Sequence, residues 1–301
     1  MYKHLLSLLT VLVLISCSNK TNYQADLQKA DYLHDSMKNL SDIMVHDIFS
    51  PPVASRIYTY PSIAAYEVIA RFDENYNSME GQLRHFPEID SSLDQTMVQA
   101  EIAAVYAFNT VGKAMIFSTE KMDEFVASLD AEYKALGVPK SVLNASISYG
   151  ETIAHAILDW ASEDNYNETR SFPRYTVDDK PGTWKPTPPK YMDGIEPHWR
   201  EIRPMVLESS SQFKPADPTS FDVSEKSQFY KETLEVYETV KNASEEEIEI
   251  ASFWDCNPYV MNLKGHLMFA TKKITPGGHW IGITRLACIK DSADIKKSAL
   301  A

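Results

Sequence analysis

Residues 96–117, TMVQAEIAAVYAFNTVGKAMIF, decide the fold of this chain. The stretch is apolar almost all round, and the preceding Ser92-Leu93-Asp94-Gln95 has the spacing of a capping box, which is a start signal for a helix. A helix that is apolar on every side has to be surrounded by other elements. The stretch therefore predicts a central, buried helix whose core residues include Ile102, Val105, Tyr106, Phe108, Val111 and Met115.

Apolar residues at helical spacing predict further helices on the N-terminal side of this segment. One runs over residues 23–49, where Ser50-Pro51-Pro52 ends it and opens the next. That second helix continues to Arg71, and we expect Pro61 to kink or split it.

On the C-terminal side, a helix over residues 120–136 is expected to end at Gly137. An apolar stripe then predicts a helix that runs to about Asp164, because its members recur every three or four residues: Val142, Ala145, Tyr149, Ile153, Ile157 and Trp160. Short joins between long helices make them antiparallel neighbours. The sequence predicts an all-α fold in which residues 23–164 form an antiparallel helical bundle, and no stretch shows the sustained alternation of a strand.

Residues 165–220 differ from the rest, because nine of the sixteen prolines fall there and aromatic residues are interleaved with them. Proline excludes long helices and central strands. Disordered linkers are poor in aromatics, so we predict a long ordered excursion across the bundle, with a flexible linker as the alternative. Residues 221–301 are predicted to form further helices, one of them after the capping box Ser244-Glu245-Glu246-Glu247 and one capped by Asp291 or Ser292.

The N-terminus has the build of an export signal. Lys3 precedes an apolar stretch that is too short to span a bilayer and that ends in Leu14-Ile15-Ser16-Cys17. This ending resembles a bacterial lipobox, which implies a signal peptide over 1–16, lipidation of Cys17 and a tether over 17–22. We expect an exported protein that is anchored in the lipid bilayer through Cys17, on the periplasmic face of the outer membrane. An ordinary secretory signal with an incidental cysteine is the alternative.

Composition and motifs exclude several classes of function. The formal charge of −13 argues against nucleic acid as a partner, because phosphate binding needs a basic face. Cys256 and Cys288 are expected to be two buried thiols, with a single disulfide between them as the alternative. The sequence contains no Gly-x-Ser-x-Gly, no phosphate loop, no Cys-x-x-Cys and no His-Glu-x-x-His.

Polar and aromatic side chains gather near expected helix ends between residues 253 and 283. Free N–H groups at a helix start suit an anion, although such residues are more often caps and partners at the edge of a core. A weaker hypothesis makes Asp255, His266 and His279 metal ligands. The candidate residues at the edge of a pocket are Trp254, Asp255, His266, His279 and Trp280.

Two motifs carry a family resemblance. Phe253-Trp254-Asp255, followed about twenty residues later by Pro276-Gly277-Gly278-His279-Trp280, resembles the middle of the bacterial vanadium-dependent haloperoxidases, relatives of the type 2 phosphatidic acid phosphatases. Residues 45–58 and Tyr66-Glu67 resemble the lipoprotein branch of that family. Together the matches span roughly residues 40–290.

The resemblance implies helical bundles that hold vanadate or phosphate among cationic side chains and N–H groups. The family's cradle is encoded by Lys-x6-Arg-Pro, Pro-Ser-Gly-His and Ser-Arg-x5-His. Arg203-Pro204 offers the arginine and proline of the first motif, but Glu196 stands where the lysine belongs. In Pro276-Gly277-Gly278-His279, Gly277 replaces the hydroxyl donor of the second motif. No catalytic or metal-binding residue of the family is therefore assigned to this chain.

These observations predict an incomplete member of the vanadium-dependent haloperoxidase and acid phosphatase superfamily, inactive by itself. Residues 221–301 would lead into a missing catalytic bundle. The resemblance implies that the full-length parent uses vanadate to oxidise halide with peroxide, whereas this chain holds no cofactor. Alternatives are a phosphatase of the same superfamily, acting on a phosphate ester, and a non-catalytic ligand-binding lipoprotein with a groove along residues 165–220.

Overall fold

The computed structural model describes residues 23–188, 191–257, 260–264, 267–271 and 273–301. Cys17, the expected signal peptide, the expected tether and His266 lie outside the described residues. Among the helices that are described, none combines the length and apolar character that crossing a membrane requires.

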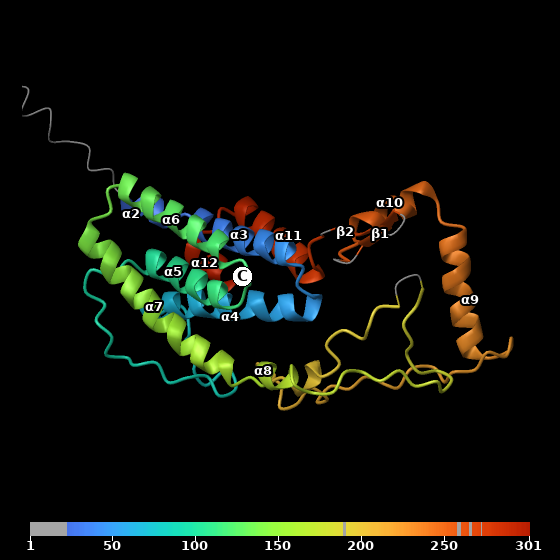
Figure 1. The fold of residues 1–301 in the computed structure, drawn as a ribbon. Helices are drawn as coiled ribbons and strands as arrows, with labels where there is room; N and C mark the ends of the chain where they lie inside the picture. The colour runs from blue at the N-terminus through green and yellow to red at the C-terminus, as the bar shows by residue number, and fades with distance from the viewer. Residues whose placement is uncertain (1–22, 189–190, 258–259, 265–266, 272) are drawn as a thin grey trace, which may run out of the picture.

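The predicted all-α class is confirmed. Three long helices, α4, α5 and α7, pack against one another at the centre of a bundle, and α3, α6, α11 and α12 lie around them (Figure 1). The elements of the N-terminal part are α2 (Tyr23–Leu27), α3 (Asp31–Asp47), α4 (Pro51–Phe72), α5 (Ala100–Ala114), α6 (Thr119–Ala135) and α7 (Lys140–Ser162).

Helix α5 is buried over most of its length, as its apolar circumference predicts. Its predicted start is wrong, because the helix begins at Ala100 and not after Gln95. Residues 93–95 are irregular and lie between turns at residues 91–92 and 96–97, and the Asp94 carboxylate accepts the Thr96 N–H at 2.8 Å. The hydroxyl of Ser146 on α7 accepts the Gln99 N–H at 2.8 Å. A side chain from another helix therefore satisfies the start of α5, and no local motif reports such a contact.

Two other predicted boundaries are corrected. Of the kink or split expected at Pro61, the split is wrong: helix α4 continues through Pro61, because its burial against α5 and α7 outweighs the roughly 3 kcal/mol that an interior proline costs. The first predicted helix is instead two helices, α2 and α3, which are separated at residues 28–30. There the Gln28 carbonyl accepts the N–H of Ile295, so the C-terminal α12 occupies the break.

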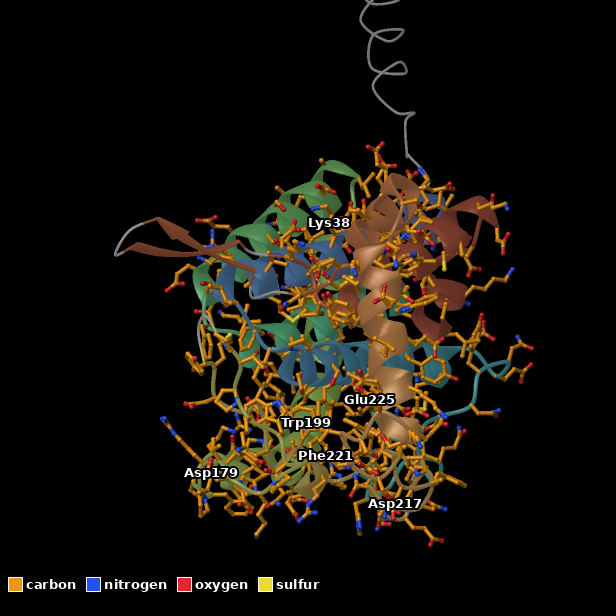
Figure 2. All side chains as sticks on the ribbon, turned by 90° about the vertical axis from the view of Figure 1, so that its right-hand side faces the viewer. Lys38, Asp179, Trp199, Asp217, Phe221 and Glu225 are labelled. Atoms are coloured by element: carbon orange, nitrogen blue, oxygen red, sulfur yellow. The ribbon has the colours of Figure 1, made fainter. Side chains whose placement is uncertain are left out.

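The proline-rich segment 165–220 contains only α8 (Tyr166–Thr169) and the 3₁₀ turn η1 (Trp199–Glu201) as helical elements among its described residues. From α8, beside the bundle, it extends beyond the end of the bundle and away from the central helices (Figure 1). Figure 2 shows Asp179, Asp217 and Phe221 at the end of the molecule opposite to Lys38 of α3. The backbone of Arg84 bonds to the Met205 carbonyl at 2.9 Å, which ties the segment to the bundle.

The C-terminal part consists of α9 (Gln228–Lys241), α10 (Glu245–Phe253), a hairpin, α11 (Pro276–Lys290) and α12 (Ile295–Leu300). The predicted capping box at Ser244 and Glu247 is confirmed. Asp294, and not Asp291 or Ser292, caps α12. The expectation of no strand is wrong, because β1 (Val260–Lys264) and β2 (Leu267–Thr271) pair antiparallel, Val260 opposite Thr271. Five residues a strand are too few for a clear alternation.

Exposed apolar side chains are concentrated in the C-terminal part of the molecule. Except for Met97 and Phe117, the large apolar side chains that are exposed among the described residues all come after residue 170. No residue of α9 or α10 is buried, and α9 stands away from the bundle (Figure 1). Large exposed apolar areas mark surfaces that other protein or membrane covers.

An ion pair fastens the C-terminal helix. Lys296 Nζ of α12 donates to an Asp73 carboxylate oxygen at 2.8 Å, just beyond the end of α4. This hydrogen bond is the largest of the effects that lower the pKa of Asp73 to about 2, and the backbone N–H and side chain of Asn75 add to it.

We expect α12 to loosen in acid. Because the folded pKa is below the ordinary value, the contribution of Asp73 is complete above pH 3.8 and is lost as the pH falls towards about 2. Protection of the α12 amides against hydrogen exchange, relative to an unstructured chain at the same pH, should fall across this window. In Asp73→Asn, protection should be low already at pH 6 and should lose this step; an unchanged step would contradict the assignment.

Candidate functional site

A groove of about 790 Å³ opens between α3, α4, α11 and α12, with the residues that follow α10 at one end. Its walls are mostly apolar, and they include Leu33, Met37, Ile63, Phe108, Ile281 and Leu286. Asp255 and His279, two of the residues predicted from the sequence, also line it.

An aromatic cluster brings the predicted pocket-edge residues together. The Trp254 ring stacks on the His279 imidazole with centroids 5.0 Å apart, and it lies 6.0 Å from the Trp280 ring. The Phe253 ring meets the same imidazole edge-on at 5.4 Å. The cluster therefore joins the end of α10 to the first turn of α11, although the predicted His266 lies outside the described residues.

Helix α11 is positioned by its first turn. Thr275 caps the helix, accepting the Gly278 N–H at 3.3 Å. A Cβ atom on Gly278 would lie 2.5 Å from the Tyr58 hydroxyl of α4, so only glycine allows this approach. The close contact fixes His279, the next residue, against the groove.

The described side-chain partner of the Asp255 carboxylate is a lysine. The carboxylate accepts a hydrogen bond from Lys273 Nζ at 2.5 Å, and this bond, followed by one from the Asn257 N–H, lowers the pKa of Asp255. In the part of the chain that the structure describes, no three His, Cys, Asp or Glu residues are grouped to hold a metal ion. Because His266 is not described, the hypothesis of a site with Asp255 and His279 stays a prediction.

Sequence reasoning missed Cys256 as a site residue. Its Sγ lies 3.0 Å from Nδ1 of His279, and it also lines the groove. The thiol directly follows Phe253-Trp254-Asp255, so its place in the motif was the available signal. Cys256 and Cys288 are both free thiols, as predicted, but the expected burial is wrong for Cys256, which is half-buried, and correct for Cys288.

Three residues that line the groove have a buried polar atom without a hydrogen-bond partner among the described residues. These atoms are His34 Nδ1, Arg285 Nε and Ser298 Oγ. Burial is the main cause that lowers the pKa of His34, and the nearby Arg285 adds to it. The Arg285 guanidinium is 3.5 Å from the Asp35 carboxylate, so its charge is partly balanced.

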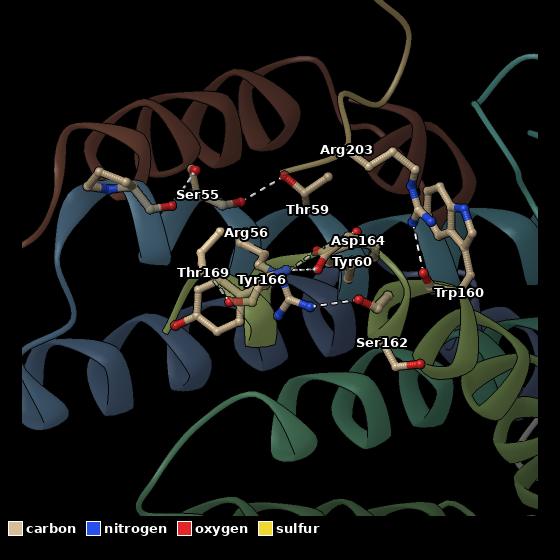
Figure 3. A network of polar contacts seen from close by, with 12 residues as sticks. Ser55, Arg56, Thr59, Tyr60, Trp160, Ser162, Asp164, Tyr166, Thr169 and Arg203 are labelled. Atoms are coloured by element: carbon tan, nitrogen blue, oxygen red, sulfur yellow. Dashed lines mark hydrogen bonds and ion pairs between the residues drawn. The ribbon is translucent and has the colours of Figure 1, made fainter. Parts of the chain in front are cut away.

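A second polar cluster joins α4, the end of α7 and the proline-rich segment (Figure 3). The Asp164 carboxylate is 1% exposed and accepts hydrogen bonds from Arg56 Nε at 2.7 Å, the Tyr60 hydroxyl at 2.9 Å and the Tyr166 N–H at 2.8 Å. Burial, and then Asp164, raise the pKa of Tyr60, so its hydroxyl remains a donor. The Arg56 guanidinium lies 4.5 Å from the centre of the Tyr166 ring.

This cluster does not fit vanadate or phosphate, because its cations already have partners. Arg56 is neutralised by Asp164, and Arg170 is paired with Glu196, the residue that stands in the place of the family's lysine. Arg203 bonds the Trp160 carbonyl at 2.8 Å and covers the Trp160 ring, which leaves only its Nε buried without a partner. An oxyanion needs several free donors that converge on one point.

Comparison with solved structures decides the relationship. The chain superimposes with a TM-score of 0.81 on a crystal structure described as the first bacterial vanadium-dependent iodoperoxidase, at 45% sequence identity over 91% of this chain. The chain is related to the vanadium-dependent haloperoxidases. No protein-family model matches the sequence, and no curated protein is significantly similar to it.

The chain spans 64% of the length of the iodoperoxidase that it matches. The predicted resemblance and helical fold are confirmed by this match. The fold of the haloperoxidase relative and that of this chain agree over 91% of this chain.

Proposed function

We propose that this chain is the N-terminal part of a vanadium-dependent haloperoxidase, and that the groups holding vanadate belong to the remaining part of the family's length. In the complete protein, bound vanadate would activate peroxide for the oxidation of halide. The chain by itself would bind no vanadate and be inactive.

One observation carries the proposal: the arginines that the fold brings together in the Asp164 cluster are engaged by carboxylates, a carbonyl and aromatic rings. Its second support is the 64% coverage of the iodoperoxidase. The apolar surfaces of α9, α10 and α11 are of the kind that further helices would cover.

We further propose that Cys17 carries lipid and anchors the exported protein in the cell envelope, on the periplasmic face of the outer membrane. The support for this is the Leu14-Ile15-Ser16-Cys17 sequence. Mass spectrometry of the protein from membranes of a bacterial host tests it, since a mature chain that begins at an unmodified residue would contradict lipidation.

Residues 1–301 should show no vanadate-dependent oxidation of iodide by hydrogen peroxide and no hydrolysis of p-nitrophenyl phosphate. Equilibrium dialysis with vanadate should detect no binding, because Arg56 and Arg170 of the Asp164 cluster are already paired with carboxylates. Iodide oxidation that is lost when vanadate is removed by a chelator, or phosphatase activity in the pure protein, would contradict the proposal.

A chimera tests whether vanadate binding and activity can be gained. Joining the part of the iodoperoxidase that the match does not cover to residue 301 should give vanadate binding and turnover. A folded chimera that binds no vanadate would show that the cradle lies elsewhere.

A further inference from the structure

Cys256 and His279 form a thiol–imidazole pair on the wall of the groove. Sγ and Nδ1 are 3.0 Å apart, a distance at which the imidazole can accept the thiol proton. The two residues come from different elements, because Cys256 follows α10 and His279 lies in the first turn of α11. Trp254 stacks on the imidazole and Phe253 meets it edge-on, so the ring is held in place.

The surroundings of the pair leave the thiol accessible to a small reagent. Cys256 is half-buried and lines the groove, whereas Cys288, on the same groove, is only 8% exposed. The neighbouring Asp255 carboxylate is paired with Lys273, which offsets the negative charge next to the sulfur. Reactive cysteines characteristically combine a nearby base with partial exposure.

We propose that Cys256 is a peroxide-reactive thiol and that His279 is its proton acceptor. The thiol proton moves to Nδ1 of His279, and a sulfur electron pair attacks one oxygen of hydrogen peroxide. The O–O bond breaks, and the departing hydroxide takes up a proton to leave as water. The balance is R–SH + H₂O₂ → R–SOH + H₂O, in which sulfur loses two electrons and peroxide gains them.

This modification site is independent of the proposed function, because the reaction requires only the thiol, the imidazole and added peroxide. It needs neither vanadate nor residues beyond 301.

The test treats the purified chain with a few equivalents of hydrogen peroxide in the presence of dimedone, which traps sulfenic acid. Trypsin separates the two thiols, because Lys264 and Arg285 lie between them. Mass spectrometry should show dimedone on the Cys256 peptide and little on the Cys288 peptide. Equal labelling of both peptides in the folded protein, or none on Cys256, would overturn the proposal.

A histidine variant tests the role of the imidazole. His279→Gln should slow labelling of Cys256 by about tenfold or more, because the proton acceptor is lost. His155→Gln, which changes an exposed histidine of α7, should leave the rate unchanged. Labelling of Cys288 reports unfolding of either variant. An unaltered Cys256 rate in folded His279→Gln would show that the imidazole has no part in the reaction.

Discussion

Replacing Asp164 by alanine should lower the free energy of unfolding by about 3–5 kcal/mol, the cost of breaking a buried ion pair from one side. The Arg56 side chain is 13% exposed, so its charge would lose its partner without gaining full hydration. The Tyr60 hydroxyl and the Tyr166 N–H would lose their acceptor at the same time. Chemical denaturation followed by circular dichroism measures the loss.

Asp159→Ala is the matched control for this prediction. Asp159 is exposed in the last turn of α7, five residues before Asp164, so its replacement should change stability by no more than about 0.5 kcal/mol. The double variant Arg56→Met with Asp164→Ala should be less destabilised than the sum of the two single variants, because it leaves no unpaired charge. If the losses of stability in the two single variants add up to the loss in the double variant, the two side chains are not coupled.

Replacing Gly150 by alanine should destabilise the protein by about 3 kcal/mol, at the upper end of what overpacking costs. Helices α5 and α7 meet at this residue, where a Cβ atom would lie 2.3 Å from the Ala103 carbonyl oxygen and 3.2 Å from the Ala107 nitrogen. Both obstacles are backbone atoms, so no rotamer change relieves the clash. The helices would have to separate, and the transition in denaturant should move accordingly.

Gly282→Ala on α11 is the control for this second substitution. A Cβ atom there meets nothing within 4 Å, and the residue is helical. Alanine should therefore stabilise the chain by about 0.5–1 kcal/mol through helix propensity. If Gly150→Ala and Gly282→Ala change stability alike, the close contact of α5 with α7 does not limit the packing.

The motif in the aromatic cluster was predicted from the sequence, whereas the long-range contacts of the aromatic and charged clusters were not. The motif at 253–280 was found from its family resemblance, and the structure brings Trp254, His279 and Trp280 together there. The Cys256 contact was missed, because no pattern reports that two residues 23 positions apart face each other. The same holds for Arg56 and Asp164, which are 108 positions apart.

The sequence by itself determined the helical class, the burial of α5 and the haloperoxidase relationship. Those features follow from periodicity and motifs, which record which faces of each segment avoid water. Only the tertiary structure decided where α5 starts, that α4 passes through Pro61 and which partners hold Arg56, Asp164 and Cys256. These outcomes depend on how the helices pack, because the groups that satisfy each buried polar atom come from other elements of the chain.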